Sequence, residues 1–565
     1  MDAELRDAGR LIETAPRATR ATRSPPARHR GALEATAALV GSLACATAIF
    51  GAFVGAGGRY LDDWWLGVNI AFPRSLGFAG SYDYLTFYSG ARPGAVAYWL
   101  GTYELFGFHD GWHRALSVAL AGALAAACYL LLRELRLGRA DAAAIALLTL
   151  ALPVADAIHF WITPAVAQLC LTACLLGLLV AVRALRAPPS PRAIALHAAS
   201  LALLGASLLM AETMLPAIAL SLLVYRTQVS WRRAAARWSA DLLLVGIATI
   251  HYAVSSPVRL TGADRSIGAL AHARTIADEL LTLFTSTIVP YAPGRAWVLG
   301  GLLAGAVLVG AQLARRRRGG GDLAPIVRWL VVGAVAALTA AASYAIYVPA
   351  AASYTPLSPG VGNRVNIGAL VPLAVLAYAV VRLIGGIVAH PRARTVVTAA
   401  LLAAVLVPAL LRLGADRTLW IAAAQQQETV LSAVQAALPT PPTGASLLVL
   451  NAPGVVTRFG RLGHASINQP VPVFSTWWEL DAAVKLRLGR PDVAAYPIWA
   501  DQPPQVLCGA HYVYQLGLDG VRHALPYGRV YVIDVHEPQA IRLDDARTCT
   551  QVTERRPTIR YDLAV

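Results

Sequence analysis

Long apolar stretches recur along the chain, and most have the length that a helix needs to cross a bilayer. A spanning helix takes about 20 mostly apolar residues. Of the 565 residues, 57% are hydrophobic and only 14% are charged, with a mean hydropathy of +0.54, whereas soluble domains carry about 25% charged residues. We therefore expect a mainly α-helical, polytopic membrane protein. The expected transmembrane helices, about eleven, lie near residues 33–56, 114–133, 140–156, 161–182, 194–211, 213–226, 239–254, 296–314, 327–348, 365–389 and 395–413.

Basic residues alternate regularly between the connecting loops. Loops such as "RELRLGR", "YRTQVSWRRAAAR" and "LARRRRGGG" fall on the same side as the basic N-terminus, whereas the turns near Asp156 and Glu212 contain no Lys or Arg. Because Lys- and Arg-rich loops stay in the cytoplasm, we expect a multi-pass protein of the cell membrane with its N-terminus inside and its C-terminal domain outside. Stretches 140–156 and 213–226 are the shortest, and losing one of them would reverse the sidedness of everything that follows.

The net charge of +16 does not indicate a nucleic-acid-binding surface. The cations lie in short clusters between apolar stretches and form no extended basic face. The run from Arg315 to Arg318 is typical of a cytoplasmic loop that contacts anionic lipid. Residues 1–32 are polar and basic and should form a disordered cytoplasmic tail. Membrane lipid, and no nucleic acid, is therefore the expected partner of these charges.

The last 150 or so residues differ in kind from the rest. Runs such as "SLLVLNAPG" and "YGRVYVIDVH" are short, rich in β-branched residues and bounded by Gly, Pro or Asn, which is typical of strands. We expect residues 33–413 to form a transmembrane domain whose first extracytoplasmic loop is 57–113. Residues 414–565 should form a soluble extracytoplasmic domain of α/β or β-rich type.

Two of the six cysteines fall in this C-terminal segment. Cys508 and Cys549 lie there, while the other four lie inside apolar stretches, where thiols behave as small hydrophobic groups. Two thiols in an oxidising compartment would be expected to pair, whereas in cytoplasm they would stay reduced. Both alternatives are open from the sequence.

The stretch "YLDDWW" places two carboxylates, Asp62 and Asp63, directly after the first apolar stretch. A charged residue at the bilayer surface could simply belong to a solvated loop. The aromatic neighbours argue against free hydration, however, and ionisable groups at membrane depth are functional candidates. A carboxylate could accept the proton of an acceptor hydroxyl while that oxygen attacks the anomeric carbon of a sugar. One aspartate suffices for such a displacement, and the other could orient it, hold the acceptor or help to bind a cation.

The order of these features resembles that of the C-type (GT-C) membrane glycosyltransferases, such as protein mannosyltransferases, aminoarabinose transferases and arabinofuranosyltransferases. In that superfamily a first span is followed by an acidic pair, interfacial helices and a Pro motif. "LDDWW" matches the pair, with Asp62 at the catalytic position, and "ARPGAVAYWLGTYELFG" matches the later stretch. The resemblance covers residues 33 to 185. Arg92-Pro93 stands where the mannosyltransferase branch has His-Pro-Pro, and Asp-Asp replaces Asp-Glu, so the protein acceptor of that branch is not carried over.

The resemblance implies inverting transfer of a sugar from a polyprenyl-phosphate donor to an extracytoplasmic glycan, lipid or protein acceptor. Such donors need no nucleotide, which agrees with the absence of GxGxxG and GxxxxGKS loops from the sequence. A transporter or flippase of lipid-linked sugars is an alternative, although the sequence lacks the two matching halves typical of transporters. A non-catalytic partner in envelope polysaccharide assembly is another.

Three further polar residues lie near expected outer helix ends. Asp156 and His159 lie in "LPVADAIHFWITP", a loop in which related enzymes place a second acidic residue; the alternatives are a helix-end polar group and an interfacial anchor. With the acidic pair they could ligate a divalent cation, but no spacing such as HExxH indicates a dedicated metal site. No cofactor is therefore certain. Glu212 could bind the acceptor or cap a helix.

A guanidinium at the outer mouth of a span could hold the phosphate of a lipid-linked donor through two parallel hydrogen bonds. Arg364, in "TPLSPGVGNRVNIG", is the first candidate, and the alternative is an arginine that extends to the lipid headgroups. The rival phosphate ligands are Arg92, Arg259, Arg265 and Arg295.

Adjacent tryptophans lie in the C-terminal segment, in "FSTWWELD". Trp477 and Trp478 could stack on sugar rings, because an aromatic face complements the apolar face of a pyranose. Packing in the core of the C-terminal domain is the alternative.

Overall fold

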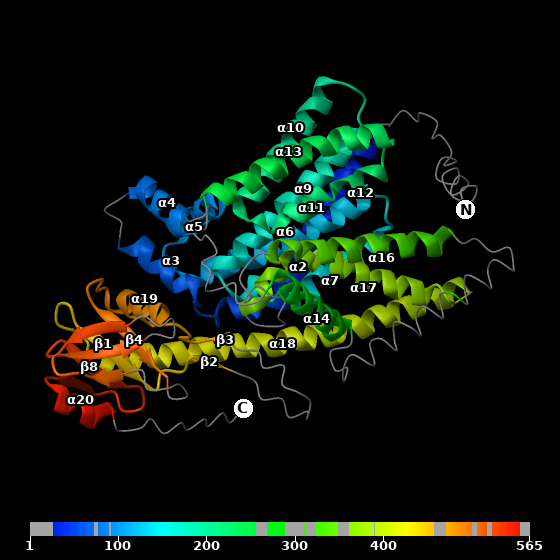
Figure 1. The fold of residues 1–565 in the computed structure, drawn as a ribbon. Coiled ribbons are helices and arrows are strands. Elements are labelled where there is room, and N and C mark those ends of the chain that lie inside the picture. Colours follow the sequence, from blue (N-terminus) through cyan, green and yellow to red (C-terminus); the bar gives the residue numbers. More distant parts are fainter. Residues whose placement is uncertain are drawn as a thin grey trace.

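The computed structural model describes residues 26–72, 77–89, 92–255, 268–288, 310, 324–348, 361–388, 390–456, 471–499, 506–516 and 522–553 (Figure 1). Eight helices within these residues are long and apolar enough to cross a membrane. They are α2 (Pro26–Val54), α6 (Asp110–Glu134), α9 (Val166–Arg186), α10 (Pro191–Met210), α13 (Trp231–Ser255), α16 (Ala324–Ser343), α17 (Ile367–Gly385) and α18 (Pro391–Ala437). The protein is therefore a mainly helical membrane protein, as its composition predicts.

The structure does not confirm the predicted count of about eleven spans. Stretch 140–156 forms α7 (Arg139–Ala151), whose 13 residues are too few to span. This helix stops because Pro153 follows Leu152 and forces that residue into an extended conformation, with ψ at 124°. Stretch 213–226 is divided into η3 (Glu212–Met214), α11 (Leu215–Ala219) and α12 (Ser221–Arg226). Stretch 296–314 lies, except for residue 310, outside the described residues.

Glycines permit the closest approaches between the long helices. A Cβ atom added to Gly122 of α6 would lie 2.7 Å from the Leu43 side chain of α2, and one on Gly177 of α9 would lie 2.8 Å from the Leu204 side chain of α10. Small residues at such positions let helix backbones approach each other in membranes. The pairs α2–α6 and α9–α10 are therefore closely packed.

Several short helices gather at one end of this bundle, where α2 and α10 end and α6, α9 and α17 begin (Figure 1). The predicted first loop folds into three of them, α3 (Asp62–Ala71), α4 (Gly77–Tyr88) and α5 (Pro93–Phe106). Four further short elements are α8 (Ala157–Phe160), η2 (Thr163–Ala165), η5 (Ala345–Tyr347) and η6 (Val361–Asn366), and α14 (Ala269–Ile288) is a helix of 20 residues. Segments far apart in the sequence thus converge at the end that carries Asp62.

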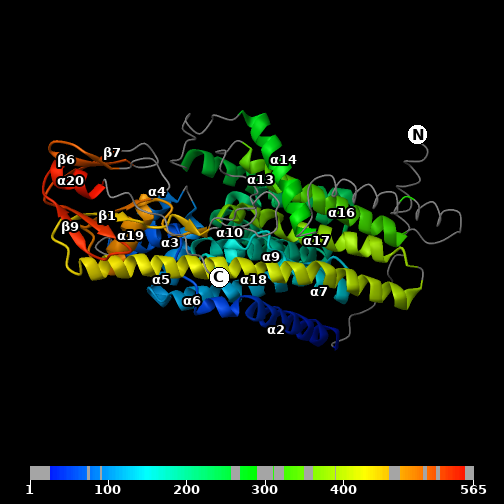
Figure 2. The same ribbon diagram turned by 90° about the horizontal axis from the view of Figure 1, so that it is seen from below.

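Helix α18 is 47 residues long and continues well past the apolar stretch 395–413 (Figure 2). The predicted domain boundary at residue 414 therefore falls inside a helix. The helix ends at Ala437, because Leu438 precedes Pro439 and adopts a non-helical conformation, with ψ at 74°. At the other end of the chain, α2 begins at Pro26, so residues 26–32 of the predicted tail are helical; residues 1–25 lie outside the described part.

Residues 438–553 are called the C-terminal region below, and their described part contains strands and two helices, α19 (Trp477–Leu488) and α20 (Ala546–Thr553). A four-stranded sheet has the order β4-β1-β8-β9, in which β1 is parallel to β4 and β8, and β9 is antiparallel to β8. Strands β2-β3 and β5-β6-β7 form two smaller antiparallel sheets. The strands are β1 (Ser446–Leu450), β2 (Val455–Val456), β3 (Val471–Pro472), β4 (Ala494–Ile498), β5 (Val506–Cys508), β6 (Tyr512–Leu516), β7 (Arg522–Pro526), β8 (Val530–Asp534) and β9 (Ala540–Leu543).

The C-terminal region shares a hydrophobic core with the helical bundle. One cluster of buried side chains contains Phe53 of α2, Trp420 of α18, and Phe474 and Leu480 of the C-terminal region. Because burial of apolar side chains stabilises contacts without regard to direction, this shared core holds the region against the end of the bundle that carries the first loop.

A disulfide bond joins Cys508 of β5 to Cys549 of α20, which is one of the two alternatives left open by the sequence. The other four cysteines are free thiols. The bond closes a loop of 41 residues and ties the small β5-β6-β7 sheet to the last described helix.

Candidate active site

Asp62 and Asp63 occupy the first turn of α3, after a strained residue. Leu61 has a φ of 42°, a conformation that L-residues with a branched or bulky side chain rarely adopt. Such strain persists only where the surrounding structure imposes it, and it clusters at functional sites. The two carboxylates that follow this turn have different surroundings, because successive residues of a helix point about 100° apart.

Asp63 is fully buried and is surrounded by hydrogen-bond donors. Its carboxylate accepts hydrogen bonds from the Thr163 backbone N–H at 2.7 Å, the Thr163 hydroxyl at 2.5 Å, the Tyr60 N–H at 3.0 Å and the Ile162 N–H at 3.4 Å. Burial raises the pKa of Asp63 to about 7, although the hydrogen bonds from Thr163 and Tyr60 lower it. Asp63 therefore fastens the start of α3 to the segment between α8 and α9.

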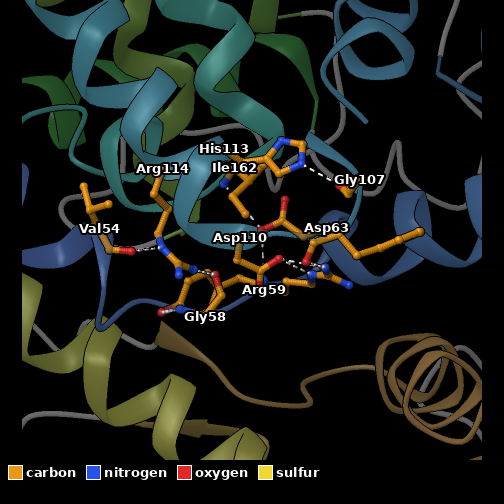
Figure 3. Close-up of polar contacts among 11 residues, drawn as sticks. Val54, Gly58, Arg59, Asp63, Gly107, Asp110, His113, Arg114 and Ile162 are labelled. Atoms are coloured by element: carbon orange, nitrogen blue, oxygen red, sulfur yellow. Dashed lines mark hydrogen bonds and ion pairs between the residues drawn. The ribbon is translucent and has the colours of Figure 1, made fainter. Parts of the chain in front are cut away.

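A polar network supports this part of the first loop (Figure 3). Arg59 donates to Asp110 at 2.8 Å and to the Phe108 carbonyl at 2.9 Å, and Arg114 donates to the Val54 carbonyl at 2.8 Å. The Tyr60 hydroxyl donates to the Trp420 carbonyl of α18 at 2.6 Å. The chain on the N-terminal side of Asp62 is thus held by both α6 and α18.

Asp62, in contrast, is partly exposed and accepts no hydrogen bond from any residue that the structure describes. Burial raises the pKa of Asp62, and the positive charges of Arg364 and Arg92 oppose that rise. The structure therefore brings together three of the predicted site residues, which lie far apart in the sequence. A carboxylate without donors, close enough to two guanidinium groups to feel their charge, can accept a proton.

The two arginines are held by different partners. Arg92 precedes α5 and forms a two-point ion pair with Glu212, with contacts of 2.9 Å and 2.5 Å. Burial raises the pKa of Glu212, but the charge and hydrogen bonds of Arg92 outweigh it and lower the pKa below its usual value. Arg364, in η6, lies over the ring of Trp161 at 5.3 Å from its centre. The predicted residue Glu212 thus positions Arg92.

Asp156 and His159 are buried deeper, among aromatic side chains. Asp156 accepts a hydrogen bond of 3.4 Å from the Trp420 indole, and the ring of His159 stacks on Phe50 at 4.3 Å. Neither residue contacts the Asp62 or Asp63 side chain through a recorded hydrogen bond. Among the described residues, no group of three or more His, Cys, Asp or Glu side chains could hold a metal ion.

The predicted tryptophan pair lies at the start of α19. Trp477 packs between Tyr496 and His523, with ring centres 6.1 Å and 5.2 Å away, as expected for core packing. Trp478 is partly exposed. The rival phosphate ligands Arg259, Arg265 and Arg295, like the run from Arg315 to Arg318, lie outside the described residues.

Glu479 is not among the site residues predicted from the sequence. This residue is fully buried in the first turn of α19, and the charge of Asp62 acts on it. The Thr-x-x-Glu spacing from Thr476 to Glu479 is a readable helix-start signal, but nothing in the sequence places that helix beside α3.

Neither a protein-family model nor a curated protein matches the chain.

Proposed function

We propose that the protein is a membrane glycosyltransferase of the GT-C type that transfers a sugar from a polyprenyl-phosphate donor to an extracytoplasmic envelope acceptor. The observation that carries this proposal is the juxtaposition of Asp62, which has no hydrogen-bond donor among the described residues, with Arg92 and Arg364. A base and a phosphate site side by side are what a single-displacement sugar transfer requires.

In the proposed reaction Asp62 removes the proton of an acceptor hydroxyl. The acceptor oxygen forms a bond to the anomeric carbon from the face opposite the phosphate, so the configuration inverts. The bond between that carbon and the phosphate oxygen breaks, and its electron pair leaves with the polyprenyl phosphate. Arg364 and Arg92 stabilise the charge that develops there. Asp63 holds Asp62 in place and Glu212 orients Arg92.

The proposed location is the cell membrane, with the N-terminus in the cytoplasm and Asp62 and the C-terminal region outside. The basic loops support this orientation, and the Cys508–Cys549 disulfide agrees with an oxidising compartment. Stretches 140–156 and 213–226 form only short helices in the structure, but the chain still passes from one end of the bundle to the other along each of them. Arg186, at the end of α9, contacts Glu134 at the end of α6 and Gln228 after α12, whereas Gln168 near the start of α9 donates to Ser117 near the start of α6. The predicted sidedness of the later segments is therefore kept. Membrane lipid surrounds the long helices, and the acceptor is a glycan, a lipid or a protein.

The test is transfer of radiolabelled sugar from a panel of polyprenyl-phosphate donors in membranes that contain equal amounts of wild type or Asp62→Asn. We expect the wild type to transfer and the variant to lose on the order of a hundredfold or more, as for removal of a general base. Asp83→Asn is a matched control, because Asp83 is an exposed aspartate of the same loop, on α4. Equal transfer by wild type and Asp62→Asn would refute the role of Asp62. No transfer with any donor, together with lipid-linked sugar movement across vesicles, would favour a flippase.

A further inference from the structure

Helix α19 of the C-terminal region packs against α3, the helix that begins with Asp62 (Figures 1 and 2). A Cβ atom added to Gly67 would lie 3.0 Å from the Leu486 side chain, so the later turns of the two helices are in contact. The first turns are also neighbours, since Asp62 and Glu479 interact electrostatically. Gly67 follows Asp62 and Leu486 follows Glu479, so the two helices run in the same direction with their N-terminal ends together.

Glu479 organises the start of α19. Its Oε2 atom accepts hydrogen bonds from the Ser475 N–H at 2.5 Å and the Thr476 N–H at 3.1 Å, and the Ser475 hydroxyl lies 3.2 Å from both carboxyl oxygens. These bonds satisfy N–H groups at a helix start that would otherwise lack partners. The same carboxyl group is fully buried. It therefore caps α19 and also lies near enough to Asp62 to feel its charge.

We propose that Glu479 is a positioning residue for Asp62: its carboxyl group fastens the first turn of α19 beside the first turn of α3 and sets the charge that the Asp62 carboxylate meets. This inference rests on the proposed function, in which Asp62 is the base. It also gives the C-terminal region a part in the site, because Arg92 and Arg364 belong to the helical bundle whereas Glu479 does not.

The protonation state of Glu479 decides whether its side chain repels the Asp62 carboxylate. Burial raises the pKa of Glu479 to about 8, and the nearby charge of Asp62 raises it as well. At neutral pH the group is therefore mostly uncharged and does not repel the Asp62 carboxylate. As the pH rises through 8, a second negative charge appears beside Asp62 in a buried position, which should loosen the junction of the two helices.

The charged and titratable groups around α19 come from several elements. Strand β4, which also packs against α19, carries no charged residue and one titratable group, Tyr496. On the helices α3, α18 and α19 near this junction they are Asp62, Asp63, Glu428, Asp481, Lys485 and Arg487. Arg59, which pairs with Asp110, lies beside Gly67 of α3, and His523 of β7 lies beside Trp477 of α19. Asp481 pairs with Lys485 at 2.6 Å and Glu428 pairs with Arg487 at 2.6 Å, whereas Asp63 is occupied by Thr163. Ionisation of Glu479 should therefore act mainly on Asp62, which has no hydrogen-bond donor among the described residues.

The decisive variant is Glu479→Gln, because glutamine reproduces the neutral acid. Its Oε1 can accept from both backbone N–H groups while its Nε2 donates to the Ser475 hydroxyl. Helix α19 should therefore form, and the variant should transfer at pH 7 within about twofold of wild type. At one pH unit above the pKa, wild-type transfer should fall about tenfold while Glu479→Gln stays level. The acid limb of the transfer rate, which reflects protonation of Asp62, should lie at the same pH in the variant as in the wild type. Glu428→Gln is the matched control and should keep the wild-type profile.

A second measurement does not depend on activity. Because folding raises the pKa of Glu479, the wild type should lose thermal stability as the pH rises from about 5 to 9, and Glu479→Gln should lose less. Asp62→Asn should reduce the loss, since it removes a charge that raises the pKa of Glu479. Parallel stability profiles in wild type, Asp62→Asn and Glu479→Gln would overturn the inference. Coupled stability profiles without any sugar transfer would instead refute only the proposed function.

Discussion

The carboxylates of Asp62 and Asp241 have opposite surroundings: Asp62 is partly exposed and Asp241 is fully buried. In the cluster around Asp241, Tyr225 and Ser221 of α12 donate to Asp241 of α13 at 2.7 Å and 2.8 Å, and Arg237 of the same helix pairs with its other oxygen. Arg237 also donates to Ser200 of α10 at 2.7 Å. At the Asp62 site the arginines lie nearby, but no described residue donates to Asp62.

The difference separates structural from chemical roles. A carboxylate whose two oxygens both accept hydrogen bonds stabilises the helices that supply the donors, and it has little capacity left for a substrate. A carboxylate without donors has both oxygens open to a substrate, and burial that raises its pKa, as at Asp62, makes it a better proton acceptor. The Asp241 cluster should therefore matter for folding and the Asp62 site for reaction.

Asp62→Asn should give the largest effect on activity and almost none on stability. We expect transfer to fall by a factor of about 10² to 10⁴, the usual contribution of a general base, because asparagine cannot accept the proton. Thermal unfolding in detergent should shift little, since Asp62 makes no hydrogen bond with the described residues. A large loss of stability in this variant would remove the contrast with Asp241.

Asp241→Ala should reduce stability strongly and transfer activity little. Removing one partner of a buried ion pair leaves an uncompensated charge on Arg237, and we expect a loss of about 3 kcal/mol in unfolding free energy. Transfer per folded molecule should stay near the wild-type value. The double variant Arg237→Met/Asp241→Leu is the control, because it removes both charges and should recover much of the stability. If the double variant were as unstable as Asp241→Ala, the cluster would stabilise the fold through packing and not through its ion pair.

The sequence predicts the long helices well where the apolar stretches are long, as for α6 and α17. It overestimates the spans where proline intervenes, because hydropathy averaged over 140–156 does not register that Pro153 ends α7. It also divides the chain at residue 414, although α18 crosses that position as one helix. The acidic pair was visible in the sequence, and so were Arg92, Arg364 and Glu212 as separate candidates.

Their grouping was not predictable, because it depends on tertiary contacts. The sequence could not show that Glu212 pairs with Arg92 across 120 positions, or that Asp63 and Asp62 have different surroundings. It gave no reason to place Glu479 beside Asp62, since that contact requires the C-terminal region to share a core with the bundle. Periodicity and motifs describe local structure, whereas the contacts that create these surroundings are all long-range.

Asp63→Ala should reduce both sugar transfer and stability, so its effects should lie between those of Asp62→Asn and Asp241→Ala. The substitution leaves the buried N–H groups of Thr163 and Tyr60 without acceptors, which should cost about 2 kcal/mol in unfolding free energy. Transfer should fall too, because the start of α3 loses its attachment and Asp62 loses its position. Asp63→Asn retains one acceptor oxygen, so it should lose less unfolding free energy and less transfer activity than Asp63→Ala. If Asp63→Asn lost activity as completely as Asp62→Asn with full stability, Asp63 would share the proton-transfer role.

Arg364→Gln should have the smallest effect and the most specific one. The KM for the donor should rise roughly tenfold, the equivalent of one charge-assisted hydrogen bond to phosphate. The guanidinium also lowers the pKa of Asp62, so its removal should raise that pKa and move the acid limb of the transfer rate to higher pH, because the base works only when deprotonated. Arg364→Lys keeps the charge but not the two-point geometry. Arg364→Lys should therefore leave the acid limb of the transfer rate in place while still raising the KM. If the acid limb shifted as far in Arg364→Lys as in Arg364→Gln, the positive charge alone would not explain how this residue affects Asp62.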